Sequence, residues 1–334
     1  MQTPDLSVII PVYNEEEGLP ALFARIYAAL DALPLSYEIV FINDGSSDRS
    51  AVLLRQQFQK RPNVTRVVLL NGNFGQHMAI MAGFAHARGR RVVTLDADLQ
   101  DPPEEIGNLM VEMDRGHDYV GTIRRKRQAS VLRRYASRAM NKVREHITRV
   151  KMTDQGCMLR AYSRDIVDAM VSSREVNTYI PALAYTYAAN PTEIEVTHGE
   201  RAAGESKYSW YQLVRLNFDL ITGFSVVPLQ LYSILGFLVS LVSVGFFAVI
   251  IYRRFAYGSE AEGLFTLFAI AFLLLGVALF GIGLLGEYVG RIYQQVRDRP
   301  RYLIQAVLEA EDPAAGSTRP EEPQLAEVRV APRA

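Results

Sequence analysis

The segment Val92-Val93-Thr94-Leu95-Asp96-Ala97-Asp98 is an apolar run that stops on two carboxylates one residue apart. Such a run predicts a buried strand, which carries Asp96 and Asp98 to the rim of a sheet. Ligands of open α/β proteins bind at this rim, and carboxylates there suit a hard divalent cation that also takes phosphate oxygens. The pair is also compatible with the cap of a following helix, because residues 102–105 are Pro-Pro-Glu-Glu.

Strand-like and helix-like segments alternate on both sides of this run. The predicted strands are residues 6–12, 38–43, 64–70, 91–95 and 118–122. The predicted helices are residues 18–33, 48–61, 76–88 and 104–115. This alternation predicts an α/β fold in which helices cover both faces of a mostly parallel sheet.

Polar segments follow three of the predicted strands. They are Pro11-Val12-Tyr13-Asn14-Glu15, Asn43-Asp44-Gly45-Ser46-Ser47-Asp48 and Asp96-Ala97-Asp98-Leu99-Gln100. Because parallel strands end at a common edge, we expect these segments to converge on one ligand site. Asp44 is expected where a nucleotide base or ribose would lie.

Composition narrows the class of protein. Among 334 residues, Lys plus Arg and Asp plus Glu number 36 each, so no overall basic field favours binding to nucleic acid. The single cysteine, Cys157, excludes an internal disulfide framework and fits a reducing compartment. We expect Cys157 to be a small buried apolar residue.

Two stretches without charged residues, 220–252 and 263–286, are long enough to cross a bilayer. We predict spans at residues 229–252 and 263–286. A pair of buried core helices is the alternative, which the lack of a polar face disfavours. Arginines follow the second span at positions 291, 297, 299 and 301, although the short loop also carries two. No leader-like segment opens the chain, so we expect both termini in the cytoplasm.

These signals divide the chain into five predicted parts. They are an α/β domain at 1–207, an interfacial helix at 208–228, a two-helix membrane domain at 229–286, a cytoplasmic amphipathic helix at 287–310 and a disordered tail at 311–334. An ordinary linker is the alternative for the segment that contains Trp210 and Tyr211. Small residues of the second span are compatible with a homo-oligomer: Gly276, Gly281, Gly283 and Gly286.

Several motifs resemble a known enzyme family. LSVIIPVYNEEEGL, FINDGSSD and LDADLQDPPEEI are similar to the nucleotide-sugar half of inverting family 2 glycosyltransferases, which have the GT-A fold. The paired spans and GERAAGESKYS resemble the polyisoprenyl-phosphate glycosyltransferases, such as dolichol-phosphate mannose synthase. NGNFGQHMAIMAGF, TDQGCMLRAY and LLGEYVGRIYQQVRDRPRY are most similar to the bacterial branch that transfers 4-deoxy-4-formamido-L-arabinose to undecaprenyl phosphate. The resemblance covers about residues 5–308.

The resemblance implies a membrane-anchored enzyme of the bacterial inner membrane, with its catalytic domain in the cytoplasm. It would move a sugar from a UDP-sugar to undecaprenyl phosphate with inversion, for modification of lipid A or another envelope glycan. The implied cofactor is Mg²⁺ or Mn²⁺, and the implied assembly is a homo-oligomer, a tetramer in the family. Transfer of glucose or another hexose is the alternative.

Positions that match the family imply a donor site. The uridine would be held by Pro11, Tyr13, Glu15 and Asp44. The ribose, the diphosphate and the metal would be held by Asp96 and Asp98, with Gln100 assisting at the metal. A cation held by Asp98 would stabilise the charge that builds up on the leaving diphosphate.

Four further residues have implied or open roles. Arg201 and Lys207 would lie over the phosphates from a mobile loop. His77 either contacts the donor sugar or is a solvated residue at a helix N-terminus. Asp154 is a candidate catalytic carboxylate. It would either act as a base or, because a lipid phosphate needs no strong base, orient the acceptor or a basic residue.

The acceptor phosphate would be held by Arg133 and Ser137, which share one helical face, with Arg124 as a third candidate. Arginine suits this task because its planar guanidinium binds phosphate with two parallel hydrogen bonds. The adjacent residues Arg125, Lys126 and Arg127 are equally compatible with a helix face that binds anionic headgroups.

Two other functions are alternatives to sugar transfer onto a lipid phosphate. A processive polysaccharide synthase usually carries a Gln-x-x-Arg-Trp motif, which is absent around the single tryptophan, Trp210. A non-catalytic scaffold or a flippase subunit does not need intact Asp44, Asp96, Asp98 and Gln100, and two spans offer no polar path. Metal-dependent release of UDP would separate these hypotheses.

Overall fold

An eight-stranded sheet forms the centre of the structure, a computed structural model that describes residues 3–124, 152–154, 157–173, 179–197, 227–257, 264–296 and 300–310. The strands lie in the order β7-β5-β6-β4-β1-β2-β3-β8. Their bounds are β1 Leu6–Val12, β2 Tyr37–Asn43, β3 Thr65–Leu70, β4 Arg91–Thr94, β5 Tyr119–Arg124, β6 Arg160–Ser163, β7 Pro191–Val196 and β8 Ile304–Leu308. The four neighbours β4, β1, β2 and β3 are parallel, whereas β6 and β8 run antiparallel to their partners.

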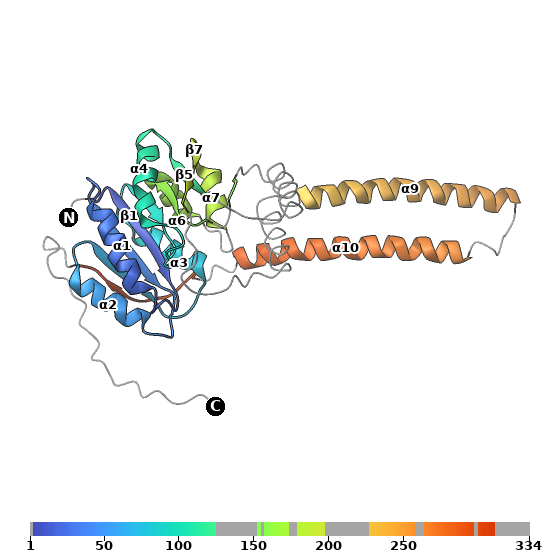
Figure 1. Cartoon of the computed structure of the whole chain (residues 1–334). Helices are drawn as coiled ribbons and strands as arrows, with labels where there is room; N and C mark the ends of the chain where they lie inside the picture. Colours follow the sequence, from blue (N-terminus) through green and yellow to red (C-terminus); the bar gives the residue numbers. More distant parts are fainter. Residues whose placement is uncertain are drawn as a thin grey trace, which may run out of the picture.

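Helices cover both faces of the sheet (Figure 1). One layer contains α1 Leu19–Asp31, α2 Ser50–Lys60, a 3-10 turn at Pro103–Glu105 and α4 Ile106–Asp114. The other contains α3 Gln76–His86, α6 Arg164–Ser172 and α7 Ile180–Tyr187. Along β1, Val8 and Ile10 pack against the first layer and Ile9 against the second. Strands buried on both faces need continuous apolar runs, which is why the sequence pattern located them.

The predicted α/β fold is confirmed for the first half of the chain. All nine elements predicted between residues 6 and 122 are present, with small shifts at their ends. The predicted strand at 91–95 is β4, and it lies beside β1 in parallel, with Ile9 opposite Thr94. The segment that ends on Asp96 and Asp98 is therefore central in the sheet.

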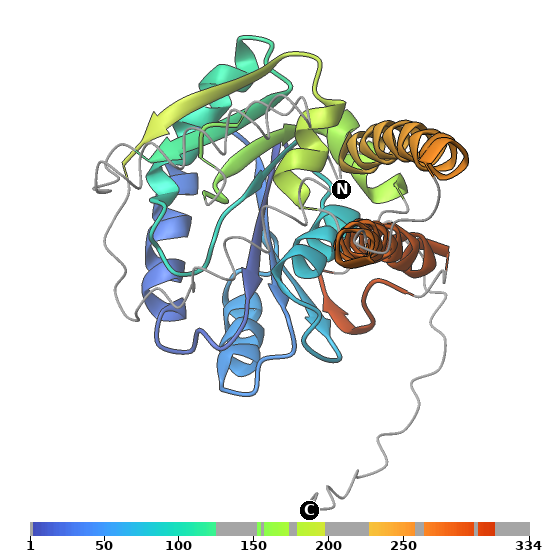
Figure 2. The same ribbon diagram turned by 90° about the vertical axis from the view of Figure 1, so that its right-hand side faces the viewer.

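Two long helices, α9 Val227–Tyr257 and α10 Leu264–Val296, extend side by side away from the sheet (Figures 1 and 2). They occupy the stretches predicted to span a membrane. The Tyr232 hydroxyl of α9 donates to the Val277 carbonyl of α10 over 3.1 Å. Several positions inside both helices have no described side chain. Within the described residues, no helix is long and apolar enough to cross a membrane, so the two spans stay a prediction.

The predicted amphipathic helix at 287–310 is wrong in its last part. The described part of helix α10 ends at Val296, and Ile304–Leu308 form β8 on the outer edge of β3. Pro300 lies between the two elements and cannot continue a helix. The edge of β3 offers unpaired backbone groups, which an extended segment satisfies. The predicted tail at 311–334 and all but the last two residues of the predicted interfacial helix lie outside the described residues.

Candidate active site

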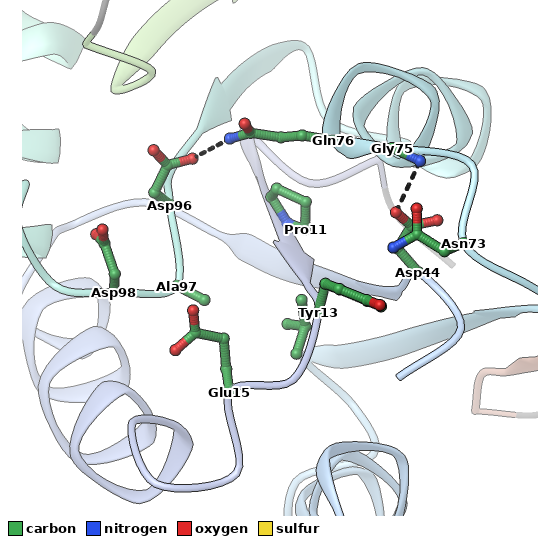
Figure 3. A pocket seen from close by; sticks show the side chains of 11 residues that line it. Pro11, Tyr13, Glu15, Asp44, Asn73, Gly75, Gln76, Asp96, Ala97 and Asp98 are labelled. Carbon is green, nitrogen blue, oxygen red and sulfur yellow. Dashed lines mark hydrogen bonds between the residues drawn. The ribbon is translucent and has the colours of Figure 1, made fainter. Parts of the chain in front are cut away.

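A pocket of about 260 Å³ lies at the carboxyl ends of β1, β2 and β4 (Figure 3). Its lining residues are Pro11, Val12, Tyr13, Glu15, Asp44, Asn73, Gly75, Gln76, Asp96, Ala97 and Asp98. The three predicted strand ends therefore meet, and they bring together six of the predicted donor-site residues. The role of each residue in binding stays a prediction.

Asp44 is buried at the end of β2 and fastens the loop that follows β3. Its Oδ1 accepts the Phe74 N–H over 2.8 Å, and its Oδ2 accepts the Gly75 N–H over 2.9 Å. Burial raises the pKa of the Asp44 carboxyl, because it disfavours the charged form, and the two N–H donors oppose that shift. Gly45 has a φ of 65°, and a Cβ there would lie 2.7 Å from the Asn73 nitrogen. Only glycine allows the two backbones to approach this closely.

Asp96 accepts a hydrogen bond from the residue that directly follows Phe74 and Gly75 in the chain. Gln76, the first residue of α3, donates from Nε2 to Asp96 Oδ1 over 2.7 Å (Figure 3). Asp98 accepts the N–H of Gln100 at Oδ1 over 3.1 Å, which closes a tight turn. Leu99, between them, has a φ of 59°. Gln100 does not line the pocket, so its predicted part at the metal stays a prediction.

The carboxylates that line the pocket fit a hard divalent cation by their chemistry. Among the described residues, no group of three or more His, Cys, Asp or Glu side chains is placed to hold a metal. That Asp96 and Asp98 hold such an ion together with oxygens of a bound diphosphate stays a prediction. Mg²⁺ is commonly bound in this way, by one or two carboxylates together with substrate phosphates.

His77 lies beside the pocket and does not line it. Its ring packs edge-on against Tyr179, with centroids 5.5 Å apart, and its Nδ1 is buried without a hydrogen-bond partner in the part of the chain described. Burial lowers the pKa of His77, so the ring is neutral near pH 7. His77 is half-buried in the first turn of α3, and contact with the donor sugar stays a prediction.

Asp154 is buried in the segment that leads to β6, and it does not line the pocket. Its backbone carbonyl accepts from Arg160 Nη2 over 2.6 Å. Arg160 also donates to the carbonyl of Cys157 over 2.9 Å and to the hydroxyl of Tyr119. The role of Asp154 in catalysis stays a prediction.

Cys157 is 1% exposed, as predicted. Its Sγ donates to Asp101 Oδ2 over 3.3 Å and lies 2.7 Å from Thr122 Oγ1. Asp101 follows the turn that carries Asp98, so Cys157 connects that turn to the segment of Asp154.

The predicted acceptor residues are not placed. Arg124 is the last residue of β5, but its side chain is not described. The remaining predicted residues lie outside the described residues: Arg133, Ser137, Arg201 and Lys207.

Three lining residues were missed by the sequence reasoning: Asn73, Gly75 and Gln76. They follow β3, whose carboxyl end lies at the same edge as those of β1 and β2. The polar segment Asn71-Gly72-Asn73 directly after an apolar strand was the signal that could have found them.

Comparisons with known proteins show the family of the chain. The family model Glycosyl transferase family 2 matches residues 7–171. An undecaprenyl-phosphate 4-deoxy-4-formamido-L-arabinose transferase of Klebsiella pneumoniae subsp. pneumoniae is 48% identical over 312 residues, which cover 93% of this chain and 95% of the relative. A transferase of the same name from Edwardsiella ictaluri is 50% identical over 310 residues, covering 92% and 95%.

Among solved structures, glucosyl-3-phosphoglycerate synthase from Mycobacterium tuberculosis, in complex with Mn²⁺, uridine-diphosphate and glucosyl-3-phosphoglycerate, has a TM-score of 0.48 at 15% identity. The match covers 66% of this chain and 78% of that chain. The matches to the two transferases cover more than nine tenths of this chain. The chain belongs to glycosyl transferase family 2 and, within it, to the family of the undecaprenyl-phosphate 4-deoxy-4-formamido-L-arabinose transferases.

Proposed function

We propose that the protein transfers 4-deoxy-4-formamido-L-arabinose from a UDP donor to undecaprenyl phosphate, with inversion at the anomeric carbon. The observation that carries the proposal is the convergence of Asp44, Asp96 and Asp98 on one pocket. Its support in sequence is the 48% and 50% identity to transferases of that name.

The donor would lie across the pocket, with the nucleoside towards β2 and the diphosphate towards β4. In this arrangement the uridine is held by Pro11, Tyr13, Glu15 and Asp44. Asp96 and Asp98 would hold the diphosphate and Mg²⁺ or Mn²⁺, with Gln100 assisting at the metal. When bound, the cation acts as a Lewis acid that stabilises the negative charge of the leaving UDP.

The acceptor phosphate supplies the nucleophile. One of its oxygens forms a bond to the anomeric carbon while the bond from that carbon to the β-phosphate oxygen of UDP breaks, so a single displacement inverts the centre. The second pKa of a phosphate monoester is about 6, so the acceptor is largely a dianion near neutral pH and needs no strong base. Asp154 then serves to orient the acceptor. The phosphate is held by Arg124, Arg133 and Ser137, and the donor phosphates are covered by Arg201 and Lys207.

Anchoring in the bacterial inner membrane belongs to the same proposal, because the acceptor is embedded in lipid. Large apolar side chains of α9 and α10 are exposed, among them Phe237 at 68%, Leu241 at 61% and Phe280 at 68%. Exposed apolar surface of this extent indicates contact with a membrane or a partner. With α9 and α10 as the two spans, the catalytic domain and both termini lie in the cytoplasm.

A donor panel tests the proposal. The full-length protein in detergent is assayed for UDP release from UDP-4-deoxy-4-formamido-L-arabinose, UDP-glucose and UDP-N-acetylgalactosamine, with and without undecaprenyl phosphate and a metal chelator. We expect release only with the formamido-arabinose donor, the lipid phosphate and the metal together. Turnover of UDP-glucose alone supports the hexosyltransferase alternative. Donor binding without turnover supports a scaffold.

Asp98→Ala is the matched variant. Loss of the carboxylate removes a ligand of the cation that stabilises the leaving group, so turnover should fall by about 10²-fold or more. Asp165→Ala, on the exposed surface of α6, is the control and should retain activity. Retained turnover in a folded Asp98→Ala protein would remove Asp98 from the metal site.

A further inference from the structure

The segment Phe74-Gly75-Gln76 bridges two carboxylates on opposite sides of β1. Strand β1 lies between β2, which ends on Asp44, and β4, which leads to Asp96. Asp44 accepts the N–H groups of Phe74 and Gly75, and Gln76 donates to Asp96 Oδ1. In the close-up of the pocket, Gly75 faces Asp44 and the Gln76 side chain points to Asp96 (Figure 3).

The bridge has a defined geometry because its backbone is fixed on both sides of Gln76. Gly75 has a φ of 89°, a conformation that side-chain-bearing residues rarely adopt, and it is the N-cap residue of α3. Gln76 begins the helix, whose next turns are buried through Ala79, Ile80 and Phe84. The Gln76 amide therefore extends from a rigid element.

The chemistry of the contact is that of a positioning group. A neutral amide N–H fixes one oxygen of a carboxylate without removing its negative charge. A lysine or arginine in this place would place a positive charge beside Asp96 and compete with a divalent cation. Gln76 therefore orients Asp96 without adding a positive charge beside it.

We propose that Gln76 is a positioning residue for donor binding and transfer, acting through the orientation of Asp96. The inference rests on the proposed function, because it assigns to Asp96 a role in holding the donor diphosphate. Gln76 is a positioning residue and not a catalytic one, because its side chain acts on the donor only through the Asp96 carboxylate.

A double-mutant cycle on UDP binding tests the inference in the full-length protein, with calorimetry as the measurement. Gln76→Ala should weaken UDP binding about 10-fold, because hydrogen bonds to charged groups are among the stronger ones. In an Asp96→Ala background the same change should have no further effect. An equal loss in both backgrounds overturns the inference, because Gln76 would then contact the donor directly.

Gln76→Glu provides a second readout that a merely structural role would not produce. The new carboxylate repels Asp96 and offers it no hydrogen-bond donor, so Gln76→Glu should weaken UDP binding more than Gln76→Ala does. Equal UDP affinities of the two variants overturn the inference.

The controls separate this inference from the proposed function. Gln56→Ala and Gln56→Glu make the same chemical changes on the exposed surface of α2 and should leave binding and transfer unchanged. If the wild-type protein neither binds UDP nor transfers a sugar, the proposed function fails and the inference falls with it. If the wild type transfers and folded Gln76→Ala equals it in UDP affinity and kcat, only the positioning role fails.

Discussion

Arg160 is the largest side chain that the described structure buries completely. A buried guanidinium is costly unless its N–H groups are matched by acceptors. Its Nε and Nη2 donate to the carbonyls of Cys157 and Asp154, and its Nη1 donates to Tyr119. Arg160 thereby holds the backbone in place at both Asp154 and Cys157.

The thiol of Cys157 should be inert in the native protein. Burial, with the nearby Asp101 carboxylate, raises the pKa of Cys157 to about 12. The reactive thiolate is then a fraction of about 10⁻⁴ at pH 8, and the sulfur is 1% exposed. We expect no iodoacetamide labelling of the native protein by mass spectrometry, and complete labelling in guanidinium. Rapid labelling without unfolding would contradict the buried position.

The apolar pattern of the sequence predicted the strands that are buried on both faces. It did not predict the strands whose pairing is decided by partners distant in the sequence. β6 is only four residues long and carries the buried Arg160, so no apolar run marks it. β7 begins at a proline and contains two glutamates. β8 is a strand because the edge of β3 is available, and that edge is more than 200 residues away in sequence. Such non-local choices override local propensity.

The candidate site likewise contains some residues that the sequence predicts and some contacts that it does not. Asp44, Asp96 and Asp98 could be predicted, because each follows an apolar run at the carboxyl edge of parallel strands. The hydrogen bond from Gln76 to Asp96 could not be predicted, because it depends on the fold of the loop after β3. That loop is fastened by Asp44, whose hydrogen bonds to backbone N–H groups leave no pattern in the sequence.

β8 should contribute measurably to the stability of the domain. Val307 packs against the core on one face of the sheet, and its neighbours Ala306 and Leu308 pack on the other. Val307→Asp places a charge in this half-buried position and should lower the free energy of unfolding by about 2 kcal/mol. Denaturant titration of the full-length protein measures this loss of unfolding free energy. Gln305→Asp, exposed on the same strand, is the control, and an equal effect of both changes would show that β8 packing is unimportant.

At the scale of the whole molecule, the chain leaves the sheet after β7, forms α9 and α10, and returns to the opposite edge as β8 (Figure 1). Glu309, just after β8, forms ion pairs with Arg66 over 3.3 Å and with Arg88 over 2.8 Å. Arg66 is buried and Arg88 is exposed, so the first pair is less screened by solvent than the second. The returning strand and its ion pairs attach the end of α10 to the catalytic domain.

The contact between α9 and α10 depends on a glycine. The ring of Tyr232 occupies the place that a Cβ of Gly281 would take, whereas a Cβ at Gly283 meets no atom within 4 Å. Gly281→Leu should force the helices apart and lower stability by about 1–3 kcal/mol, as overpacking does in other cores. Thermal unfolding in detergent measures the loss, with Gly283→Leu as the matched control. Equal midpoints for the two variants would contradict the described helix contact.

The position of β8 also sets an order of events during synthesis. Residues 304–308 leave the ribosome after both long helices have been made, although the strand that they pair with was complete more than 200 residues earlier. The nascent domain therefore exposes the bare edge of β3 throughout this interval, and such edges are templates for aggregation. In the folded protein β8 covers this edge of β3.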